Sequence, residues 1–242
     1  MRVEDIGIPV GPETLAGSLA TPDAGLPGIL FLHGWGGSQQ RDLARARKIA
    51  ALGCVCLTFD FRGHVATEAR RAQITREDSL QDALAAYDTL VGQNTVDSSC
   101  IAVVGSSYGG YLAAILSTLR PVKWMALRVP ALYRDTDWEV PKQTLSRSDL
   151  ATYRSSVTLG EDNRALAACR TFKGDVLVVE SEHDDLVPHP VVASYLAAFT
   201  SSRSLTYRMV AGADHALSDE RSQQAYDALL IGWIEEMVLG AR

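Results

Sequence analysis

The 242-residue sequence contains few cysteines for its length, and their spacing is irregular. The four are Cys54, Cys56, Cys100 and Cys169. Neither a disulfide framework nor a zinc site is expected, because no paired ligand spacing occurs among them. Cys54 and Cys56 lie two residues apart in one apolar run, so both should point to the same face of a strand. We interpret all four as small core residues in a reducing compartment.

Long apolar runs are also missing. None reaches the ~18 residues that indicate a membrane span. The N-terminal segment carries Glu4 and Asp5 and lacks the apolar region of a signal peptide. These features predict a cytoplasmic protein that does not bind a membrane.

No block of basic residues stands out, and the net charge is −6 with a pI near 5.4. Nucleic-acid binding is therefore not expected, since it depends on clustered positive charge. The densest basic cluster, Arg70, Arg71 and Arg76, is interrupted by acidic residues and is interpreted as a solvated loop. Phosphate-binding and dinucleotide-binding glycine motifs are absent, so no cofactor and no metal is predicted.

Apolar runs and turn signals predict eight strands and a single domain over residues 1–242. A hairpin or meander comes first, and strands that alternate with helices follow. This order indicates an α/β fold with a mostly parallel sheet flanked by helices. The predicted strands are Arg2–Val10, Thr14–Ala20, Gly28–Leu32, Cys54–Asp60, Ile101–Gly105, Lys123–Val129, Asp175–Ser181 and Leu205–Val210.

Three helices have marked start signals. Ser38 is expected to cap a helix that runs to Gly53, with Leu43, Ala46, Ile49 and Ala50 on its inner face. Thr75 and Asp78 resemble a capping box. Ser218 should begin the last helix, with Ala225, Leu229, Trp233 and Met237 facing inward.

Residues 129–161 do not fit the alternation of strands and helices. The segment carries prolines, aromatic residues and charges of both signs. We expect a small cap inserted over the carboxyl edge of the sheet, too short to form a second domain.

Ser107 lies in the most informative motif, Gly-x-Ser-x-Gly, between a buried strand and a run that can form a helix. A serine on such a sharp turn is lifted out of the sheet edge as a nucleophile elbow. Gly105 and Gly109 leave room for the neighbouring chain. A serine hydroxyl needs a base within hydrogen-bond reach, and the base needs an orienting carboxylate.

Along essentially its whole length the chain resembles the α/β-hydrolase superfamily of serine hydrolases, in which the nucleophile, the acid and the histidine follow in that order. The resemblance is to compact dienelactone-hydrolase-like and prolyl-oligopeptidase-like catalytic domains. It implies an eight-stranded α/β-hydrolase fold with Ser107 as nucleophile, Asp184 as acid and His215 as base. Asp184 lies in a loop similar to the family's Asp-x-x-Val-Pro, and His215 follows the last strand.

Several residues compete for these roles. Asp185 is the neighbour most easily confused with Asp184, and Glu180 and Glu182 are weaker candidates. A turn aspartate could also serve only backbone N–H groups. Among the other histidines, His33 and His64 are expected to be structural, His183 adjoins the acid, and His189 should be exposed or line the pocket.

The segment His33-Gly34-Trp35-Gly36-Gly37 resembles the family's oxyanion loop. By that resemblance the backbone N–H groups of Trp35 and Tyr108 form the oxyanion hole. A second segment, Asp60–His64, is similar to the family's Asp-x-Arg-Gly-His. Val65 stands where the family usually has glycine, and we treat this segment as structural.

The resemblance implies a carboxylesterase that hydrolyses a small or medium ester through an acyl-enzyme, without a cofactor. Thioester or small-peptide hydrolysis is the alternative, and a catalytically inactive binding protein is a third. Four residues are expected to line an apolar substrate pocket, although the cap residues among them could equally be cap core: Leu132, Tyr133, Trp138 and Leu186. The expected partner is a small-molecule ester, and nothing in the sequence defines an oligomeric state.

Overall fold

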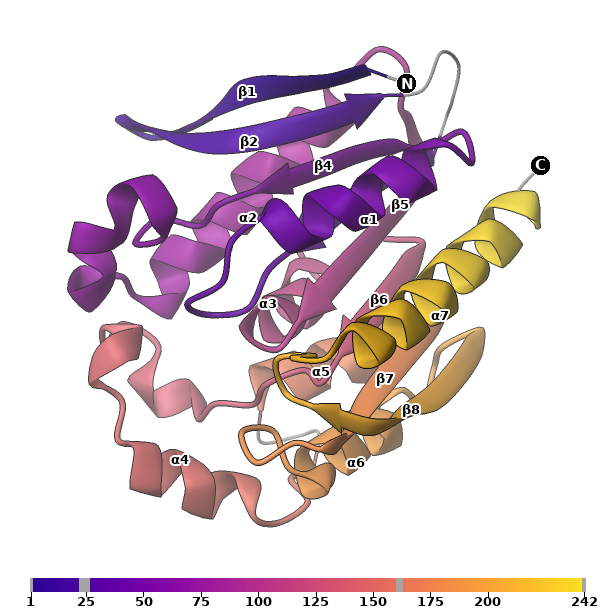
Figure 1. The fold of residues 1–242 in the computed structure, drawn as a ribbon. Helices are drawn as coiled ribbons and strands as arrows, with labels where there is room; N and C mark the ends of the chain where they lie inside the picture. Colours follow the sequence, from indigo (N-terminus) through magenta and orange to yellow (C-terminus); the bar gives the residue numbers. More distant parts are fainter. Residues whose placement is uncertain (1, 22–26, 160–162, 241–242) are drawn as a thin grey trace.

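One eight-stranded sheet organises the molecule (Figure 1). The computed structural model describes residues 2–21, 27–159 and 163–240. The strand order is β1-β2-β4-β3-β5-β6-β7-β8. The strands are β1 (Arg2–Val10), β2 (Glu13–Thr21), β3 (Pro27–Leu32), β4 (Val55–Phe59), β5 (Asp97–Ser106), β6 (Trp124–Arg128), β7 (Asp175–His183) and β8 (Ser204–Asp214).

The sheet is parallel except at one side, where β1 pairs antiparallel with β2 and β2 pairs antiparallel with β4. From β4 to β8 every pairing is parallel. Strands β3, β4 and β6 are buried along their whole length, as continuous apolar runs covered on both faces should be. The predicted mostly parallel α/β sheet is confirmed.

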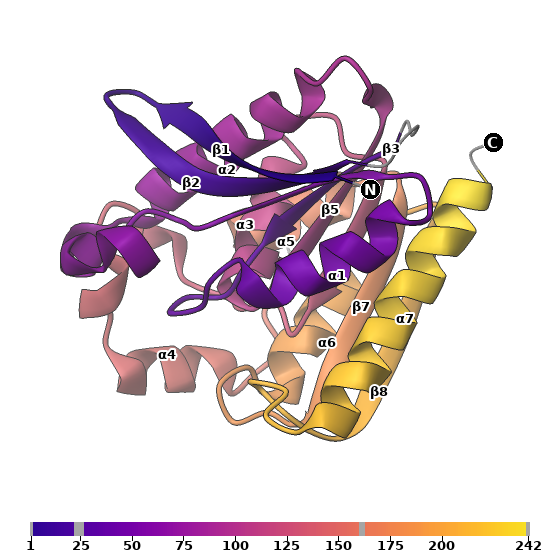
Figure 2. The ribbon, with the colours of Figure 1, turned by 45° about the horizontal axis from the view of Figure 1, so that its top comes forward.

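Helices cover both faces of the sheet (Figure 2). On one face lie α1 (Gln40–Ala50) and α7 (Glu220–Leu239). The other face carries α2 (Arg76–Val91), α3 (Tyr108–Leu116), α5 (Arg164–Thr171) and α6 (His189–Ala198). Parallel strands need such crossover helices to return the chain to the same edge, so all carboxyl ends of the parallel strands meet at one edge.

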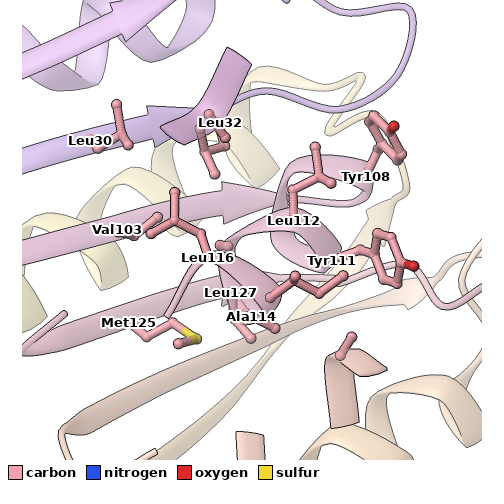
Figure 3. Packing of buried hydrophobic residues seen from close by; sticks show 14 of the residues in the cluster. Leu30, Leu32, Val103, Tyr108, Tyr111, Leu112, Ala114, Leu116, Met125 and Leu127 are labelled. Carbon is pink, nitrogen blue, oxygen red and sulfur yellow. The ribbon is translucent and has the colours of Figure 1, made fainter. Parts of the chain in front are cut away.

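Helix α3 is the most deeply buried of these helices, and it directly follows the strand that carries the serine motif. Its nine residues are all buried. Leu112 and Leu116 belong to the same buried cluster as Leu30, Val103 and Met125 of the sheet (Figure 3). Each buried leucine contributes roughly 1.5–3 kcal/mol of apolar burial. This packing holds the start of α3, and with it Ser107, in a fixed position.

The start of α1 differs from the prediction. Gln39, not Ser38, is the N-cap residue, and its side chain makes no cap hydrogen bond. Instead Asp60 Oδ1 accepts the Gln39 N–H at 2.8 Å. A carboxylate from the end of the next strand therefore replaces the local cap. The predicted inner face, which includes Leu43 and Ile49, is buried as expected.

Helix α7 is turned by about one residue from the predicted face. Asp219 rather than Ser218 caps it, by accepting the Ser222 N–H at 2.9 Å. Ser218 instead bonds back to Asp214. The buried positions are Ser222, Tyr226, Leu230, Trp233, Ile234 and Val238, whereas Ala225 is exposed and Leu229 and Met237 are only partly buried. Helix α7 carries apolar residues on two adjacent faces. The spacing of its alanines and leucines therefore does not show which of the two faces is buried.

The basic cluster is not a solvated loop throughout. Arg70 and Arg71 lie in the 3-10 helix η1 (Val65–Gln73), but Arg76 is fully buried at the start of α2. Its guanidinium donates to the Arg134 carbonyl at 2.8 Å and lies 5.5 Å from the centre of the Tyr133 ring and 5.4 Å from that of the Trp138 ring. Arg76 therefore ties the helix to the segment that follows β6. The predicted capping box at Thr75 is present.

That segment, residues 129–159, contains two short 3-10 helices, η2 (Asp135–Asp137) and η3 (Lys142–Thr144), and helix α4 (Arg147–Arg154). It lies beyond the carboxyl ends of the strands, on the same side as η1 (Figure 1). Residues 160 and 161 of the predicted cap lie outside the described residues. None of the helices described here is long and apolar enough to cross a membrane.

Candidate active site

Ser107 lies between β5 and α3 in a backbone conformation that side chains other than glycine rarely adopt. Its φ is +52° and its ψ is −113°. Two close approaches enforce this turn. A Cβ at Gly109 would lie 2.0 Å from the Leu32 carbonyl oxygen, and a Cβ at Gly105 would lie 2.6 Å from the Gly109 carbonyl oxygen. The glycines are therefore required by the approach of neighbouring backbone, and the strained turn exposes the serine at the sheet edge.

Asp184 and His215 meet at this edge from the ends of β7 and β8. His215 Nδ1 lies 2.6 Å from Asp184 Oδ2. The other carboxylate oxygen accepts the N–H groups of Leu186 at 2.9 Å and Val187 at 2.7 Å. The Asp184 side chain is only 2% exposed, whereas the His215 ring is 21% exposed. The carboxylate is thus held rigidly, and it holds one imidazole nitrogen while the ring stays accessible.

The competing acids occupy other positions. Asp185 is exposed, and His215 makes its carboxylate contact with Asp184 instead. Glu180 is buried in β7, where it contacts His189 Nδ1 at 2.9 Å and accepts the Tyr207 hydroxyl at 2.5 Å. Glu182 accepts the Gly212 N–H at 2.7 Å. The carboxylate of Asp184 alone combines burial with contact to His215.

His33 and His64 support the glycine loop that follows β3. His64 Nε2 accepts the Gly36 N–H at 2.9 Å, and His33 Nε2 accepts the Phe61 N–H at 3.2 Å. These nitrogens must be unprotonated to accept, so each Nδ1–H donates to a carbonyl, from Arg62 and Gly34 respectively. Burial lowers the pKa of His64 to about 4 and also lowers the pKa of His33. Both rings are therefore neutral supports of this loop near pH 7.

Tyr108 directly follows Ser107, and Trp35 lines the same cavity as Ser107. Among the residues described, neither backbone N–H group donates a backbone hydrogen bond outside regular helices and strands. The Trp35 ring packs edge-on against Tyr108 at 5.3 Å and against His64 at 4.9 Å. A Cβ at Gly34 would lie 3.4 Å from Ser107 Cβ, so the loop passes close to the serine. Two unused backbone donors beside a serine can hold an oxyanion.

Val65 begins η1 with a φ of +47° and is 53% exposed. A β-branched residue is strained there, since this region of φ favours glycine. The related family segment usually has glycine at this position. Val65 therefore replaces glycine at a residue whose backbone conformation glycine adopts more easily than valine.

A cavity of about 620 Å³ lies beside Ser107 and His215. Its walls carry both polar and apolar side chains and come from the glycine loop, α1, η1, the end of β6 and the loop that carries His215. The lining residues are His33, Gly34, Trp35, Gly36, Gly37, Ser38, Arg41, Asp42, Arg45, Val65, Glu68, Arg71, Ser106, Ser107, Arg128, His215, Ala216 and Leu217.

The predicted pocket residues do not line this cavity. Leu132 and Tyr133 are buried in the core, where Tyr133 packs against Tyr108 and Tyr111. Trp138 is partly buried and donates its Nε1–H to Glu77 at 2.6 Å, and Leu186 is 61% exposed. Leu132 and Tyr133 therefore match the alternative expectation of cap core, and none of the four residues lines the cavity beside Ser107. Tyr133 faces the core because α3 presents Tyr108 and Tyr111 to it, whereas Trp138 is held by Arg76 and Glu77 of α2.

Arg128, the last residue of β6, was missed in the sequence. Its carbonyl accepts the Ser107 N–H at 2.9 Å, and its guanidinium donates to the His215 carbonyl at 3.0 Å. Arg128 therefore forms hydrogen bonds with the backbone of both Ser107 and His215. The available signal was a charged residue at the carboxyl end of an apolar strand, which places it at the same edge as the nucleophile.

The Ser107 hydroxyl makes no side-chain hydrogen bond within the described ranges, although Ser107 and His215 line the same cavity. In the same part of the chain, no cluster of three or more His, Cys, Asp or Glu side chains is arranged to hold a metal ion. What the site offers is a strained serine, an imidazole held by a buried carboxylate, and two unused N–H donors.

The sequence profile of the prolyl oligopeptidase family matches residues 42–240. The chain belongs to the prolyl oligopeptidase family. The matched range includes Ser107, Asp184 and His215.

Two proteins are similar to this chain in sequence. An uncharacterized protein of Mycobacterium tuberculosis, Rv2307c, is 28% identical over 191 residues, which are 78% of this chain and 63% of that protein. This member of the prolyl oligopeptidase family thus spans less than two thirds of the length of that relative. The α/β hydrolase domain-containing protein WAV2 of Arabidopsis thaliana is 35% identical over 107 residues, which cover 44% of this chain and 34% of that one.

Solved structures share the α/β-hydrolase fold over nearly the whole chain. A dienelactone hydrolase from Anabaena variabilis superposes with a TM-score of 0.70 at 19% identity and covers 97% of both chains. An esterase domain from Rhodothermus marinus superposes with a TM-score of 0.70 at 20% identity. The match covers 98% of this chain and 99% of that one. A 2,6-dihydroxy-pseudo-oxynicotine hydrolase superposes with a TM-score of 0.75 at 14% identity. The match covers 99% of this chain and 69% of that one. The α/β-hydrolase fold expected from the sequence is confirmed.

Proposed function

We propose that this protein is a serine hydrolase that cleaves a carboxylic ester through an acyl-enzyme. The observation that carries the proposal is the contact of 2.6 Å between His215 Nδ1 and Asp184 Oδ2, beside the strained Ser107. With Nδ1 engaged by the carboxylate, Nε2 is the nitrogen left to take a proton from Ser107.

The reaction follows from these groups. His215 Nε2 accepts the Ser107 proton as the hydroxyl oxygen attacks the ester carbonyl, and then protonates the departing alcohol. Asp184 keeps the imidazole in the required tautomer and stabilises its cationic form. The N–H groups of Trp35 and Tyr108 hold the negative oxygen of the tetrahedral intermediate, and each is worth roughly 3 kcal/mol to the transition state. Water then attacks the acyl-enzyme with the same assistance, so no cofactor is needed.

Amide hydrolysis is the second candidate, because membership of the prolyl oligopeptidase family favours it. Thioester hydrolysis uses the same groups. A third candidate is an inactive binding protein. The expected substrate is a small molecule, and a cytoplasmic location remains part of the proposal.

Labelling with a fluorophosphonate probe tests the nucleophile. We expect the folded wild type to be labelled at Ser107 and Ser107→Ala to be unlabelled and inactive on short p-nitrophenyl esters. Ser117→Ala, at the far end of α3, is the matched control and should behave as the wild type. Folded wild type without label would refute the enzymatic proposal, and turnover by Ser107→Ala would refute the nucleophile.

A panel of an ester, a thioester and an aminoacyl amide of matched chain length tests the bond class. The proposal expects the highest kcat/KM for the ester. A higher value for the amide would move the assignment to peptide or aminoacyl hydrolysis.

A further inference from the structure

The cavity beside Ser107 is lined by more positive than negative side chains. Four arginines contribute to it, from α1, η1 and the end of β6: Arg41, Arg45, Arg71 and Arg128. Only two acidic residues, Asp42 and Glu68, line the same cavity. A cleft lined by one sign of charge raises the local concentration of ligands of the opposite sign.

Both acidic residues are already paired with arginines of the cavity. Arg45 Nη1 lies 3.0 Å from Asp42 Oδ1, and Arg71 Nη1 lies 3.2 Å from Glu68 Oε1. Arg45 also contacts Asp227 at 2.8 Å. These pairs account for the two acidic charges, so the excess positive charge resides on Arg41 and Arg128.

Arg128 is a buried guanidinium with no carboxylate within 4.0 Å among the residues described. It is 8% exposed, and it donates to the His215 carbonyl at 3.0 Å and to Ser181 Oγ at 3.4 Å. Both acceptors are uncharged. The guanidinium also lies 5.6 Å from the centre of the Tyr226 ring. A buried guanidinium without a carboxylate in contact is costly, and its fork has five N–H donors, more than these two hydrogen bonds use.

Arg41 is exposed and contacts the same loop. Its Nη1 donates to the Ala216 carbonyl, the residue after His215, and no carboxylate among the described side chains pairs with it. Arg41 and Arg128 therefore approach one loop, residues 215–216, from two elements. Both line the cavity that Ser107 opens into.

We propose that the substrate of this site carries an anionic group, a carboxylate or a phosphate, which Arg128 and Arg41 bind while Ser107 attacks the ester. The inference rests on the proposed function, which it narrows to anionic esters. Guanidinium groups suit this ligand because they bind planar oxyanions through two parallel hydrogen bonds. The low exposure of Arg128 strengthens that contact, because the anion places an opposite charge in direct contact with the guanidinium.

Two substrates that differ only in charge provide the test. One is mono-p-nitrophenyl adipate, and the other is its methyl ester, in which the free carboxylate is masked. A p-nitrophenyl ω-phosphonopentanoate distinguishes a phosphate-type ligand from a carboxylate. Rates with Ser107→Ala are subtracted, since a free carboxylate can attack its own ester.

For the wild type we expect kcat/KM to be about tenfold or more higher for the preferred anionic ester than for the methyl ester at low salt. The ratio should fall as sodium chloride is added, because salt screens charge. Arg128→Gln and Arg41→Gln should lower the ratio toward one. Arg47→Gln removes the same charge from an exposed position of α1 that does not line the cavity, and it should preserve the ratio.

The readout is the ratio between esters because Arg128 also supports the His215 loop. If Arg128→Gln lowers both rates equally and Arg41→Gln changes neither, the arginines are structural and the inference is wrong. A wild-type ratio of one or less, with normal fluorophosphonate labelling of Ser107, overturns the inference and leaves the proposed function intact. Absence of both labelling and ester hydrolysis overturns the proposed function and this inference with it.

Discussion

His215 Nδ1 lies 2.6 Å from Asp184 Oδ2, although the two residues come from the ends of different strands. The other oxygen of Asp184 accepts two backbone N–H groups, from Leu186 and Val187. The carboxylate therefore serves both the turn and the imidazole. Its role as a turn residue and its role as the proposed triad acid are compatible, because each uses a different oxygen.

Asp184→Asn should separate these roles. The amide can keep its oxygen on the two N–H groups, but its NH₂ then faces His215 Nδ1 and favours the wrong tautomer. We expect kcat for ester hydrolysis to fall by about a thousandfold or more with little change in folding. Asp185→Asn should remain close to the wild type because Asp185 is exposed and does not contact His215. Steady-state kinetics of both variants provide the test, and the reverse order would assign the acid to Asp185.

Gly109→Ala should prevent normal folding. The new Cβ would lie 2.0 Å from the Leu32 carbonyl oxygen, and backbone on both sides cannot yield. Gly232→Ala is the matched control, because a Cβ there meets nothing within 4 Å in the middle of α7. It should raise the free energy of unfolding by about 0.5–1 kcal/mol, since glycine disfavours a helix interior. Thermal unfolding followed by circular dichroism measures both, and equal effects would contradict the close approach at Gly109.

His64 should make the stability depend on pH. Its pKa is about 4 in the folded protein, lowered chiefly by burial, against an ordinary value of 6.5. Above pH 6.5 the imidazole is neutral in both states and its stabilising contribution is complete. Between pH 6.5 and 4 only the unfolded state gains the proton, so about 3 kcal/mol of stability is lost over that range.

Urea unfolding of the wild type and His64→Gln from pH 7.5 to 4.5 tests this expectation. The glutamine side chain does not titrate, so the free energy of unfolding of the variant should fall less steeply with decreasing pH. Titrating groups that do not contact His64, such as Asp82 with its raised pKa of about 6, are common to both proteins and cancel in the difference. His33 packs against the His64 ring, so His33→Gln is measured alongside to separate its contribution. Parallel curves would show that His64 does not titrate differently on folding.

Val65→Gly should stabilise the protein. The backbone has a φ of +47° at this exposed position, and valine is strained there. We expect the free energy of unfolding to rise by about 1 kcal/mol. Val65→Ala retains a Cβ and should gain less, which serves as the control in the same urea experiment. A larger gain for alanine than for glycine would show that side-chain bulk, and not φ, is the source of the strain.

Much of the fold was predictable because its signals are local. Continuous apolar runs, such as the one before Gly105, identify buried parallel strands, and the capping box at Thr75 marks the start of α2. The faces of helices were less predictable. Helix α7 carries apolar residues on adjacent faces, and only its packing against the sheet and α1 selects Tyr226 and Leu230 over Ala225 and Leu229.

The candidate site was likewise predictable in part from local sequence signals and in part only from tertiary packing. The sequence by itself determined the strained serine turn and the strand ends at which an acid and a histidine could meet Ser107, because strand direction and chain order carry that information. Only the tertiary structure decided that Asp184 rather than Asp185 contacts His215, and that the cavity is lined by Arg41 and Arg128 rather than by Leu132 and Tyr133. Those outcomes depend on distances between residues far apart in the chain, and such distances arise only when the elements pack together.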